Sequence, residues 1–523
     1  MILPASHARK RYEQLKAARQ PFLDRARLCA ELTVPHLFPM SEEVSTNANA
    51  FSTPYQSIGA RGVNSLSSKL LMSQLPSNTP FFRLKVSDAD LRLLGNEKER
   101  GKAEAGLAII ERTALDEIES QALRVPIYEA LRMILVGGNA LLVYLPNGKS
   151  RVFRLDRYVV KRDPMDNLLE AITHETASPA SLPRKLLQAI SDSAAAEGQD
   201  TDDLSNQKTV DIYTHLRRKG KGWESYQEVM GRVVPNSVKT YPLDKCPWLL
   251  LRFNRVNGED YGRGLVEEYY GDLRSLETLS KAIVQGSAAA AKILLLVRPT
   301  GSTKLREVRE APNGGVISGD ANDVTVLQLN KFADFRVAKD MINELQQELS
   351  ASFLMNGSVQ RQGERVTAEE IRFMAQELEG ALGGLYSILA QELQQPLVRL
   401  VLNDLERRNK IPKLPVDKVK LQITTGIEAL GRGAELTKLT HFIKFLEPFG
   451  PEVLAREMNL SDYISRVGAN LGIDTAGLIK TPEQKAQEAA AAQQQQMQAG
   501  MMDVAGKAAP HLVKGMMNGE GRQ

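Results

Sequence analysis

The chain has 523 residues, 42% of them hydrophobic, so it is long enough for about three or four domains and is not disordered throughout. Its 67 Lys and Arg and 63 Asp and Glu leave a net charge of +4, which excludes a strongly basic nucleic-acid coat and limits any DNA contact to a local or weak one. Two cysteines, Cys29 and Cys246, exclude a disulfide framework and a four-thiolate zinc site, so we expect two buried thiols in a reducing compartment.

The N-terminal segment is basic. Residues 1–27 contain seven Lys or Arg but only two acidic residues, Glu13 and Asp24, which gives a local net charge of +5. Within this segment, residues 9–19 predict a basic amphipathic helix. Such a helix is either a solvated face or a surface that docks on nucleic acid or an acidic neighbour, and both interpretations remain open.

The rest of the first half predicts a mixed α+β domain that ends near residue 260. Apolar residues at steps of three and four predict helices over 57–75, 102–123 and 128–136, the last stopped by Gly137-Gly138. Alternating apolar residues predict strands over 81–86, 141–145, 151–155, 158–162, 210–215 and 223–229. Residues 176–207, rich in Ser, Ala, Asp and Pro, predict a mobile insertion or a short helix. The longest apolar run, 133–145, is too short to span a bilayer, so we expect a soluble protein.

The second half predicts two helices joined by short strands and turns. The helices are expected over 264–285 and 335–354, and Asn356-Gly357 is expected to end the second one, because both residues tolerate a left-handed cap. The strands between the helices are expected over 293–297, 315–317 and 324–329.

A long helix is expected after the polar loop 358–366. Thr367 and Glu370 form a capping box that opens it, and its apolar stripe continues to Asn409. Four residues should bend this helix rather than end it: Gly380, Gly383, Gly384 and Pro396.

The C-terminal part predicts less order. Residues 416–480 are expected to form a small helical unit. In the tail, 481–523, Gln, Ala and Met make up 22 of 43 residues and aromatic residues are absent, so this segment cannot bury enough apolar surface alone. The tail is either disordered or a helix that neighbours in an assembly hold in place.

Catalytic and cofactor motifs are missing from the sequence. Gly301–Lys304 lacks the spacing of a phosphate-binding loop, and Gly262–Gly264 lacks that of a dinucleotide fingerprint. The six histidines are scattered, and Glu369-Glu370 is better explained by helix capping than by acid–base catalysis. We therefore expect no enzyme, no cofactor and no metal, and the long helices with a dependent tail indicate an assembly subunit.

Seven runs of sequence, in order along the chain, carry a family resemblance. They are Pro21–Arg27, Thr33–Pro39, Thr53–Gly62, Tyr269–Glu277, Gly363–Arg372, Leu385–Leu389 and Ile427–Gly433. Together they resemble the portal, or head-to-tail connector, proteins of T7-like short-tailed bacteriophages, over residues 10 to about 485. One such run would be a weak signal, whereas seven in order are specific; the tail and residues 176–207 carry no such match.

The resemblance implies an α+β, mostly α, portal fold that assembles as a dodecameric ring with an axial channel. One wedge-shaped subunit then replaces the several domains that length alone suggested. Its expected parts are a wing (1–263), a stem helix (264–290), a clip (291–330), a second stem helix (331–355), a tunnel loop (356–366), a long bent wing helix (367–420) and a crown (421–523).

The resemblance also implies which residues meet DNA and partners. The tunnel-loop residues that would face DNA are Gln360, Arg361, Gln362, Glu364 and Arg365. The stem candidates for the channel lining are Lys331, Arg336, Lys339, Glu344 and Glu348. The clip candidates for partner binding are Lys304, Arg306, Arg309 and Asn313.

The charge of the presumed channel fits weak contacts with DNA. Residues 331–380 contain six basic and nine acidic residues, a net charge of −3 per subunit. A strongly basic sleeve would hold duplex DNA by counterion release, whereas an acidic stem with a few loop arginines lets it slide. Arg361 and Arg365 either touch passing phosphates or pair with Glu364 or the next subunit.

The implied role is the DNA conduit at one capsid vertex, used in packaging, tail attachment and ejection. The implied partners are further copies of the chain, double-stranded DNA, the terminase large subunit, a tail adaptor, the major capsid and scaffolding proteins, and internal core proteins at the crown, without a membrane. The protein would reside in the virion and, during assembly, in the host cytoplasm. Two alternatives remain: a ring-forming tail or internal virion protein that conducts no DNA, and a nucleic-acid enzyme.

Overall fold

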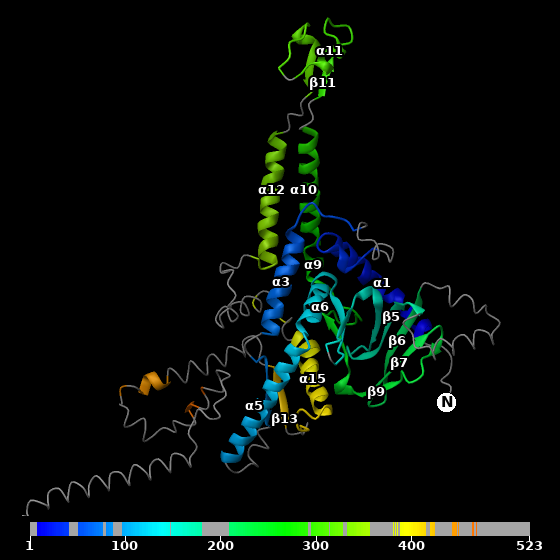
Figure 1. Cartoon of the computed structure of the whole chain (residues 1–523), viewed down its shortest axis with the longest axis vertical. Coiled ribbons are helices and arrows are strands. Elements are labelled where there is room, and N and C mark those ends of the chain that lie inside the picture. The colour runs from blue at the N-terminus through cyan, green and yellow to red at the C-terminus, as the bar shows by residue number, and fades with distance from the viewer. Residues whose placement is uncertain are drawn as a thin grey trace, which may run out of the picture. The chain divides into compact units, whose positions relative to one another are not determined.

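Figure 1 presents a computed structural model of the chain. It describes residues 8–40, 51–76, 80–86, 97–146, 148–179, 209–290, 294–312, 314–327, 332–355, 388–414 and 419–423, with a few isolated residues elsewhere. The chain divides into two compact units, Met1–Ala429 and Leu430–Gln523. In the second unit, residues 442–446 are helical, in agreement with the helical unit expected there. In the described part of the chain, no helix is long and apolar enough to cross a membrane.

The core of the first unit is built around α6 (Arg124–Gly137), which packs against α1 (Ala8–Glu31), α3 (Ile58–Gln74) and α9 (Leu265–Glu268). Ile127, Leu131 and Ile134 of α6 are completely buried. Gly138 ends the helix with a left-handed φ of 75°, which confirms the stop predicted at the paired glycines. The helices expected over 9–19, 57–75 and 128–136 are therefore present, and the first continues through Pro21 to Glu31.

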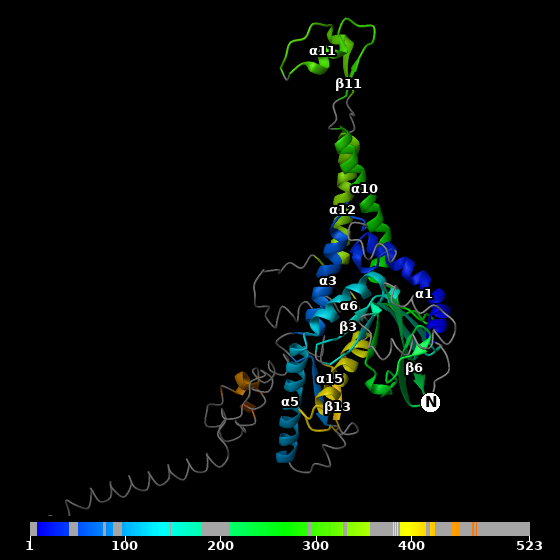
Figure 2. The same cartoon turned by 45° about the vertical axis from the view of Figure 1, so that its right-hand side comes forward.

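A six-stranded antiparallel sheet lies beside α1 (Figures 1 and 2). Its strands are β4 (Tyr158–Arg162), β5 (Leu168–Ala177), β6 (Val210–Lys219), β7 (Gly222–Val229), β8 (Arg232–Val233) and β9 (Lys239–Pro242). Tyr12 and Leu15 of α1 are buried against Val159, Ile172 and Tyr213 of this sheet. The basic helix is thus docked through its apolar face, and its exposed Lys and Arg side chains form the opposite face.

A second, three-stranded sheet is deeply buried. Its order is β10 (Trp248–Arg252), β2 (Asn139–Val143), β3 (Arg151–Phe153), and all residues of β10 and β2 are buried. The strands predicted over 141–145, 151–155, 158–162, 210–215 and 223–229 are confirmed within a few residues. The insertion 176–207 lies almost wholly outside the described residues.

A two-stranded ribbon corrects the prediction for residues 416–480. β13 (Val419–Ile423) is a strand, not part of a helix, and pairs antiparallel with β1 (Phe82–Val86). Its alternating Val419, Leu421 and Ile423 pack on the main core with β1, close to α5 (Glu97–Ser120), and this burial favours the extended form.

The long helix expected over 367–409 is described continuously from residue 388, with residues 380 and 382 also helical, and its capping box lies outside the described residues. A π-helical turn, Ala390–Gln394, leads into α15 (Gln395–Arg407). Pro396 stands at the start of α15, so the break in the regular hydrogen-bond pattern coincides with the residue that lacks an N–H. Leu389, Leu393 and Leu397 are completely buried, as the apolar stripe predicts.

Candidate functional site

Two long helices, α10 (Tyr270–Ala290) and α12 (Phe332–Ser352), lie side by side (Figures 1 and 2). Gly286, near the end of α10, meets the ring of Phe335, near the start of α12, so the helices run antiparallel. A Cβ atom on Gly286 would lie 2.7 Å from that ring, so the bare backbone is what permits the close approach. These helices confirm those predicted over 264–285 and 335–354, except that Tyr269 separates α10 from the short α9.

The C-terminal end of α12 is anchored in the core of the unit. Phe353 is completely buried, and its ring fills the space over Gly62 of α3, where a Cβ atom would lie 2.5 Å away. Lys69 of α3 donates a hydrogen bond of 2.6 Å to the carbonyl oxygen of Leu354. The prediction that Asn356-Gly357 ends the helix is wrong: α12 ends at Ser352, and Leu354 takes the left-handed φ of 53°. The N–H of Met355 then bonds to the carbonyl oxygen of Ser350, at 2.7 Å, and so closes the end of the helix.

A hydrogen-bond relay, exposed at Glu277 and buried at Gln56, anchors the N-terminal half of α10. The Glu277 carboxylate accepts hydrogen bonds from the backbone N–H of Tyr55, at 2.9 Å, and of Gln56, at 3.2 Å. Gln56 in turn accepts from the N–H of Gly59, at the start of α3, and donates to the carbonyl oxygen of Leu32. Sequence reasoning missed this role of Glu277, because no local spacing links residues that far apart.

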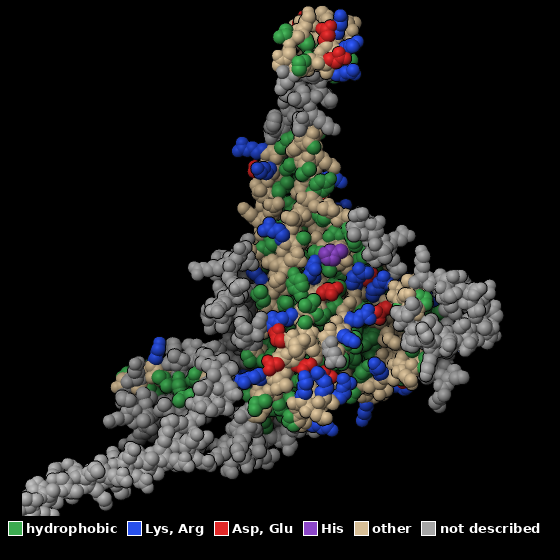
Figure 3. Space-filling model, in the orientation of Figure 1, with side chains coloured by type: hydrophobic (Ala, Val, Ile, Leu, Met, Phe, Trp, Pro, Cys, Tyr) green, Lys and Arg blue, Asp and Glu red, His purple; other side chains and the backbone are tan. Residues whose placement is uncertain are grey.

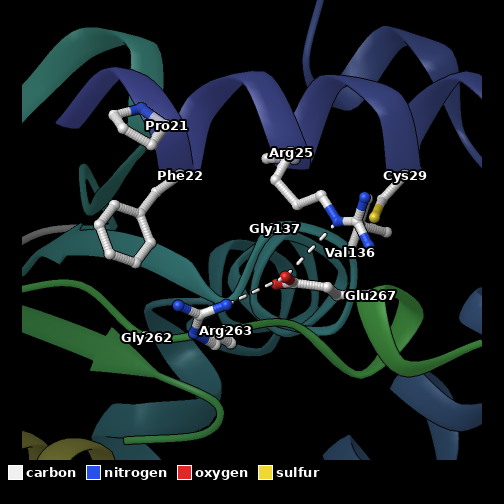
Figure 4. A pocket seen from close by; sticks show the side chains of 10 residues that line it. Pro21, Phe22, Arg25, Cys29, Val136, Gly137, Gly262, Arg263 and Glu267 are labelled. Carbon is white, nitrogen blue, oxygen red and sulfur yellow. Dashed lines mark hydrogen bonds and ion pairs between the residues drawn. The ribbon is translucent and has the colours of Figure 1, made fainter. Parts of the chain in front are cut away.

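A pocket of about 290 Å³ lies between α1, α6 and the segment that precedes α10 (Figure 4). In it, Glu267 pairs with Arg25, at 3.5 Å, and with Arg263, at 3.3 Å.

Burial raises the pKa of the Cys29 thiol, which also lines this pocket, to about 12, so this thiol stays protonated. Cys246 is also free, and burial raises its pKa to about 12. Cys29 is buried as the sequence predicts, whereas Cys246 is half-buried.

The charged side chains of α12 point into solvent. Arg336, Lys339, Glu344 and Glu348 are exposed and form no ion pair with any residue that the structure describes. The fifth predicted stem residue, Lys331, lies outside the described residues, as do all the tunnel-loop candidates: Gln360, Arg361, Gln362, Glu364 and Arg365. The structure therefore brings four of the predicted residues onto one helix.

The helix pair also exposes apolar side chains (Figure 3). Val284 of α10 is 53% exposed, and Val337 and Met341 of α12 are 62% and 49% exposed. Val337 and Met341 are four residues apart, so they share one face of α12. Exposed apolar residues in line along a helix are typical of a surface that contacts another protein.

The segment between the two helices forms a small β-hairpin with its own helix. The strands predicted over 293–297 and 324–329 are present as β11 (Leu294–Val297) and β12 (Val324–Leu327), which pair antiparallel within the chain, and α11 (Leu305–Glu310) was not predicted. The strand expected over 315–317 is wrong. Val316 is completely exposed in a loop, and the N–H of Gly315 instead closes a turn onto the carbonyl of Pro312. Alternating apolar residues form a strand only where a neighbouring strand supplies backbone hydrogen bonds, and residues 315–317 have no such neighbour among the described residues.

Asp323 organises this hairpin. Its carboxylate accepts hydrogen bonds from the Thr303 N–H and the Ser302 hydroxyl, both at 3.2 Å. These bonds, led by that of the Thr303 backbone, lower the pKa of Asp323 below its ordinary value. The carboxylate thus joins the segment after β11 to the start of β12.

The predicted partner-binding residues of the hairpin lie on its surface. Lys304 and Arg306 are exposed, and the ion pairs that they make with described residues are local, with Glu307 at 3.7 Å and Glu310 at 3.1 Å. Arg309 is also exposed, and Asn313 lies outside the described residues. The structure therefore places Lys304, Arg306 and Arg309 around one short helix, available to a partner. Among the described residues, no group of His, Cys, Asp and Glu could hold a metal ion.

Comparisons with known proteins identify relatives of the chain. A family model described as bacteriophage head to tail connecting protein matches residues 5–479. The portal protein of Escherichia phage T7 is 42% identical over 504 residues, which cover 94% of this chain and 91% of that protein. The portal protein of Enterobacteria phage T3 is 40% identical over 91% of this chain and 89% of its own length. A solved chain from the neck of a native GTA particle aligns with 80% of this chain and 89% of its own length, at a TM-score of 0.35 and 11% identity.

Proposed function

This chain belongs to the bacteriophage head-to-tail connecting proteins, and we infer from this membership that it is the portal protein of a T7-like phage, the conduit for DNA between head and tail. The observation that carries the inference is the identity of 42% and 40% to two portal proteins over at least 89% of either length. The protein is thus a component of the virion. Its work is structural, with no catalytic step and no cofactor.

We propose that twelve copies form a ring around an axial channel. In one copy, Val284, Val337 and Met341 lie in water on the helix pair. Packing the pairs of neighbouring copies side by side would cover these side chains, and burial of apolar area stabilises association. In a closed ring, each contact joins two different faces of neighbouring copies.

The portal parts follow the observed elements. We assign α10 and α12 to the stem (264–290 and 331–355) and the hairpin with α11 to the clip (291–330). The wing comprises residues 1–263 and the long helix 367–420, and the tunnel loop comprises 356–366. The crown was expected from residue 421, but residues 421–423 pair with β1, so we propose that it begins after Ile423.

The charges of the stem suit passage of DNA. Arg336, Lys339, Glu344 and Glu348 mix both signs on one exposed helix, and residues 331–380 carry a net charge of −3. Because affinity for duplex DNA rises with each phosphate that a protein neutralises, few net positive charges mean little grip and easy sliding. In this proposal the tunnel-loop arginines supply the only strong contacts.

The partners follow from the parts. We propose that the clip, through Lys304, Arg306, Arg309 and Asn313, meets the terminase large subunit during packaging and a tail adaptor afterwards. The wing would contact the major capsid and scaffolding proteins, and the crown the internal core proteins. Assembly would take place in the host cytoplasm.

Electron microscopy of the purified full-length protein tests the ring. We expect closed rings with twelve-fold symmetry and an axial channel wide enough for duplex DNA. Rings without an open axis would favour a structural tail or internal virion protein, and a protein that stays monomeric at high concentration would contradict the assembly altogether.

The tunnel loop is tested by neutralising two arginines. We expect Arg361→Gln together with Arg365→Gln to leave ring assembly unchanged and to reduce retention of packaged DNA several-fold, because two phosphate contacts per copy are lost. Nuclease protection of DNA in filled heads measures retention, and Lys221→Gln with Lys239→Gln, at two exposed positions of the wing, gives a control of equal charge change. Normal retention in the loop variant would contradict the assignment.

A further inference from the structure

The ribbon of β1 and β13 has one apolar and one cationic face. Phe82 and Leu84 of β1 are buried in the core, so the residues between and beside them point the other way. The outward face carries Arg83 and Lys85 from β1 and Lys420 and Gln422 from β13.

The two lysines stand directly opposite each other. Lys85 is the register partner of Lys420, as Arg83 is of Gln422. Opposite residues in an antiparallel pair have Cβ atoms about 5 Å apart, and like charges at such positions destabilise the pairing. Both lysines are exposed, and neither makes a hydrogen bond or ion pair with another residue in the described part of the chain.

In the part of the chain that the structure describes, no carboxylate pairs with Lys85 or Lys420. Neither strand contains Asp or Glu. Glu111 of α5, which lies beside the ribbon, accepts a hydrogen bond of 2.6 Å from the backbone N–H of Leu84. The ribbon therefore retains an unfavourable pair of cations that an external anion would relieve.

We propose that the outward face of the β1–β13 ribbon binds the phosphate backbone of double-stranded DNA, with Lys85 and Lys420 sharing one phosphate. All four outward side chains are polar, whereas the centre of a protein interface requires apolar or aromatic anchors. Contact with a phosphate backbone requires only cations at a suitable spacing. The choice of duplex DNA rests on the proposed function, and the site is separate from the tunnel loop.

The consequence is a second, weak DNA contact in each copy. Because each neutralised phosphate releases condensed counterions, the affinity should fall steeply as salt is raised. Repeated in every copy of a ring, two lysines per copy give a surface that holds DNA only where many copies contact it at once.

Covalently closed circular duplex DNA separates this surface from the channel, because a closed circle cannot thread a closed ring. We expect full-length wild-type rings to bind it. The double variant Lys85→Gln, Lys420→Gln should bind about tenfold more weakly and with a shallower dependence on salt. The control Lys221→Gln, Lys239→Gln removes two exposed lysines, one in the turn between β6 and β7 and one in β9, and should bind as wild type.

Several outcomes would overturn the proposal: wild-type rings that ignore circular DNA, or an equal loss of affinity in both double variants. A polyglutamate peptide that binds wild-type rings as tightly as DNA, and not the Lys85/Lys420 variant, would reassign the face to an acidic protein. Inorganic phosphate that displaces DNA better than chloride at equal ionic strength would reassign it to free phosphate.

A loss of DNA binding in the Lys85/Lys420 variant can be distinguished from unfolding by its melting temperature. Removing two opposed cations should leave that temperature equal to or higher than that of wild type. The proposed function is judged separately by the rings and their axial channel. A channel that persists while circular DNA binding is unaffected by the variant would remove the ribbon site and leave the portal function standing.

Discussion

The body around α6 and the helix pair α10–α12 differ in where their charged side chains lie: the body buries and pairs several of them, whereas the helix pair exposes them. In the body, Arg252 is only 3% exposed, and its guanidinium bonds to both Asp166 and Glu392. On the helix pair, Glu344 and Glu348 are exposed and unpaired among the described residues. The body thus pairs its buried charges internally, whereas the described part of the helix pair leaves Glu344 and Glu348 in water without a partner. This is the division expected when a folded anchor carries an element that functions in an assembly.

Buried charges in the body join elements that are distant in sequence. Arg252 of β10 reaches the turn after β4 through Asp166 and the π-helical turn through Glu392. Glu170 of β5 accepts hydrogen bonds from Arg11 of α1, at 2.5 Å, and pairs with His215 of β6, at 3.2 Å. Removing one partner from such a group leaves a buried charge unpaired, which costs more than the pair contributes.

The largest effect is expected from Arg252→Ala. It leaves Glu392, whose side chain is 14% exposed, with only the longer contact to Arg255, and we expect a loss of about 3 kcal/mol in the free energy of unfolding. Urea denaturation of the full chain, followed by circular dichroism, measures it. Arg255→Ala is the control, because Arg255 is more exposed and lies 3.6 and 3.7 Å from the same carboxylates. Equal losses in the two variants would show that the buried network does not stabilise the body.

A smaller effect is expected where the helix pair joins the body. Gly62→Ala places a Cβ atom against the ring of Phe353, and overpacking of this kind costs about 1–3 kcal/mol. Gly106→Ala in α5 is the control, because nothing lies within 4 Å of its Cβ position. There the better helix propensity of alanine should add about 0.5–1 kcal/mol. Melting temperatures that rise in both variants would mean that Phe353 moves away freely and anchors nothing.

Acid should weaken the body before the helix pair. Burial favours a raised pKa for Glu117, but hydrogen bonds from Gln121, Arg408 and Lys410 outweigh it and lower the pKa from 4.5 to about 2. Hydrogen bonds from His215 and Arg11 likewise lower the pKa of Glu170 to about 2 against the effect of burial. Because the folded pKa lies below the unfolded one, the stabilisation is complete above about pH 5 and is lost between pH 5 and 2.

A variant series isolates this contribution. Allowing for solvent screening, each carboxylate should contribute about 1 kcal/mol, so Glu117→Gln should lower the melting temperature at pH 7 and flatten its fall between pH 5 and 3. Glu344→Gln, on the exposed helix, should leave the profile parallel to that of wild type. A Glu117→Gln profile that is also parallel would contradict the assignment of the acid sensitivity to the body.

The sequence predicts the helices of both regions well and the strands less completely. Periodicity located α3, α6, α10 and α12, because each presents one apolar face to a neighbour. β10 was missed, since Trp248–Arg252 is buried throughout and has no alternation to detect. β13 was predicted to be helical. Its extended form depends on pairing with β1, which lies far away in the chain, so the local sequence does not reveal it.

The candidate site shows the same limit. Family resemblance supplied the charged residues of α12, and the structure places them on one exposed helix. Glu277 and Asp323 could not be recognised beforehand, because each acts through backbone groups that only the fold brings near. In the sequence, an acidic residue that accepts hydrogen bonds from a loop backbone cannot be distinguished from one that lies in solvent.

The smallest effect on overall stability is expected from Asp323→Ala, which tests whether the hairpin is independent of the body. The variant removes the acceptor of the Thr303 N–H and the Ser302 hydroxyl, so the junction of β11 and β12 should loosen. Hydrogen exchange should accelerate at residues 294–327 while the melting temperature of the body stays unchanged. Glu307→Ala, an exposed change on α11, should leave exchange as in wild type, and Asp323→Asn should retain part of the protection, since its amide oxygen still accepts. A fall in body stability with Asp323→Ala would mean that hairpin and body unfold together, and the division between a self-sufficient body and an assembly-dependent projection would then fail at its outer end.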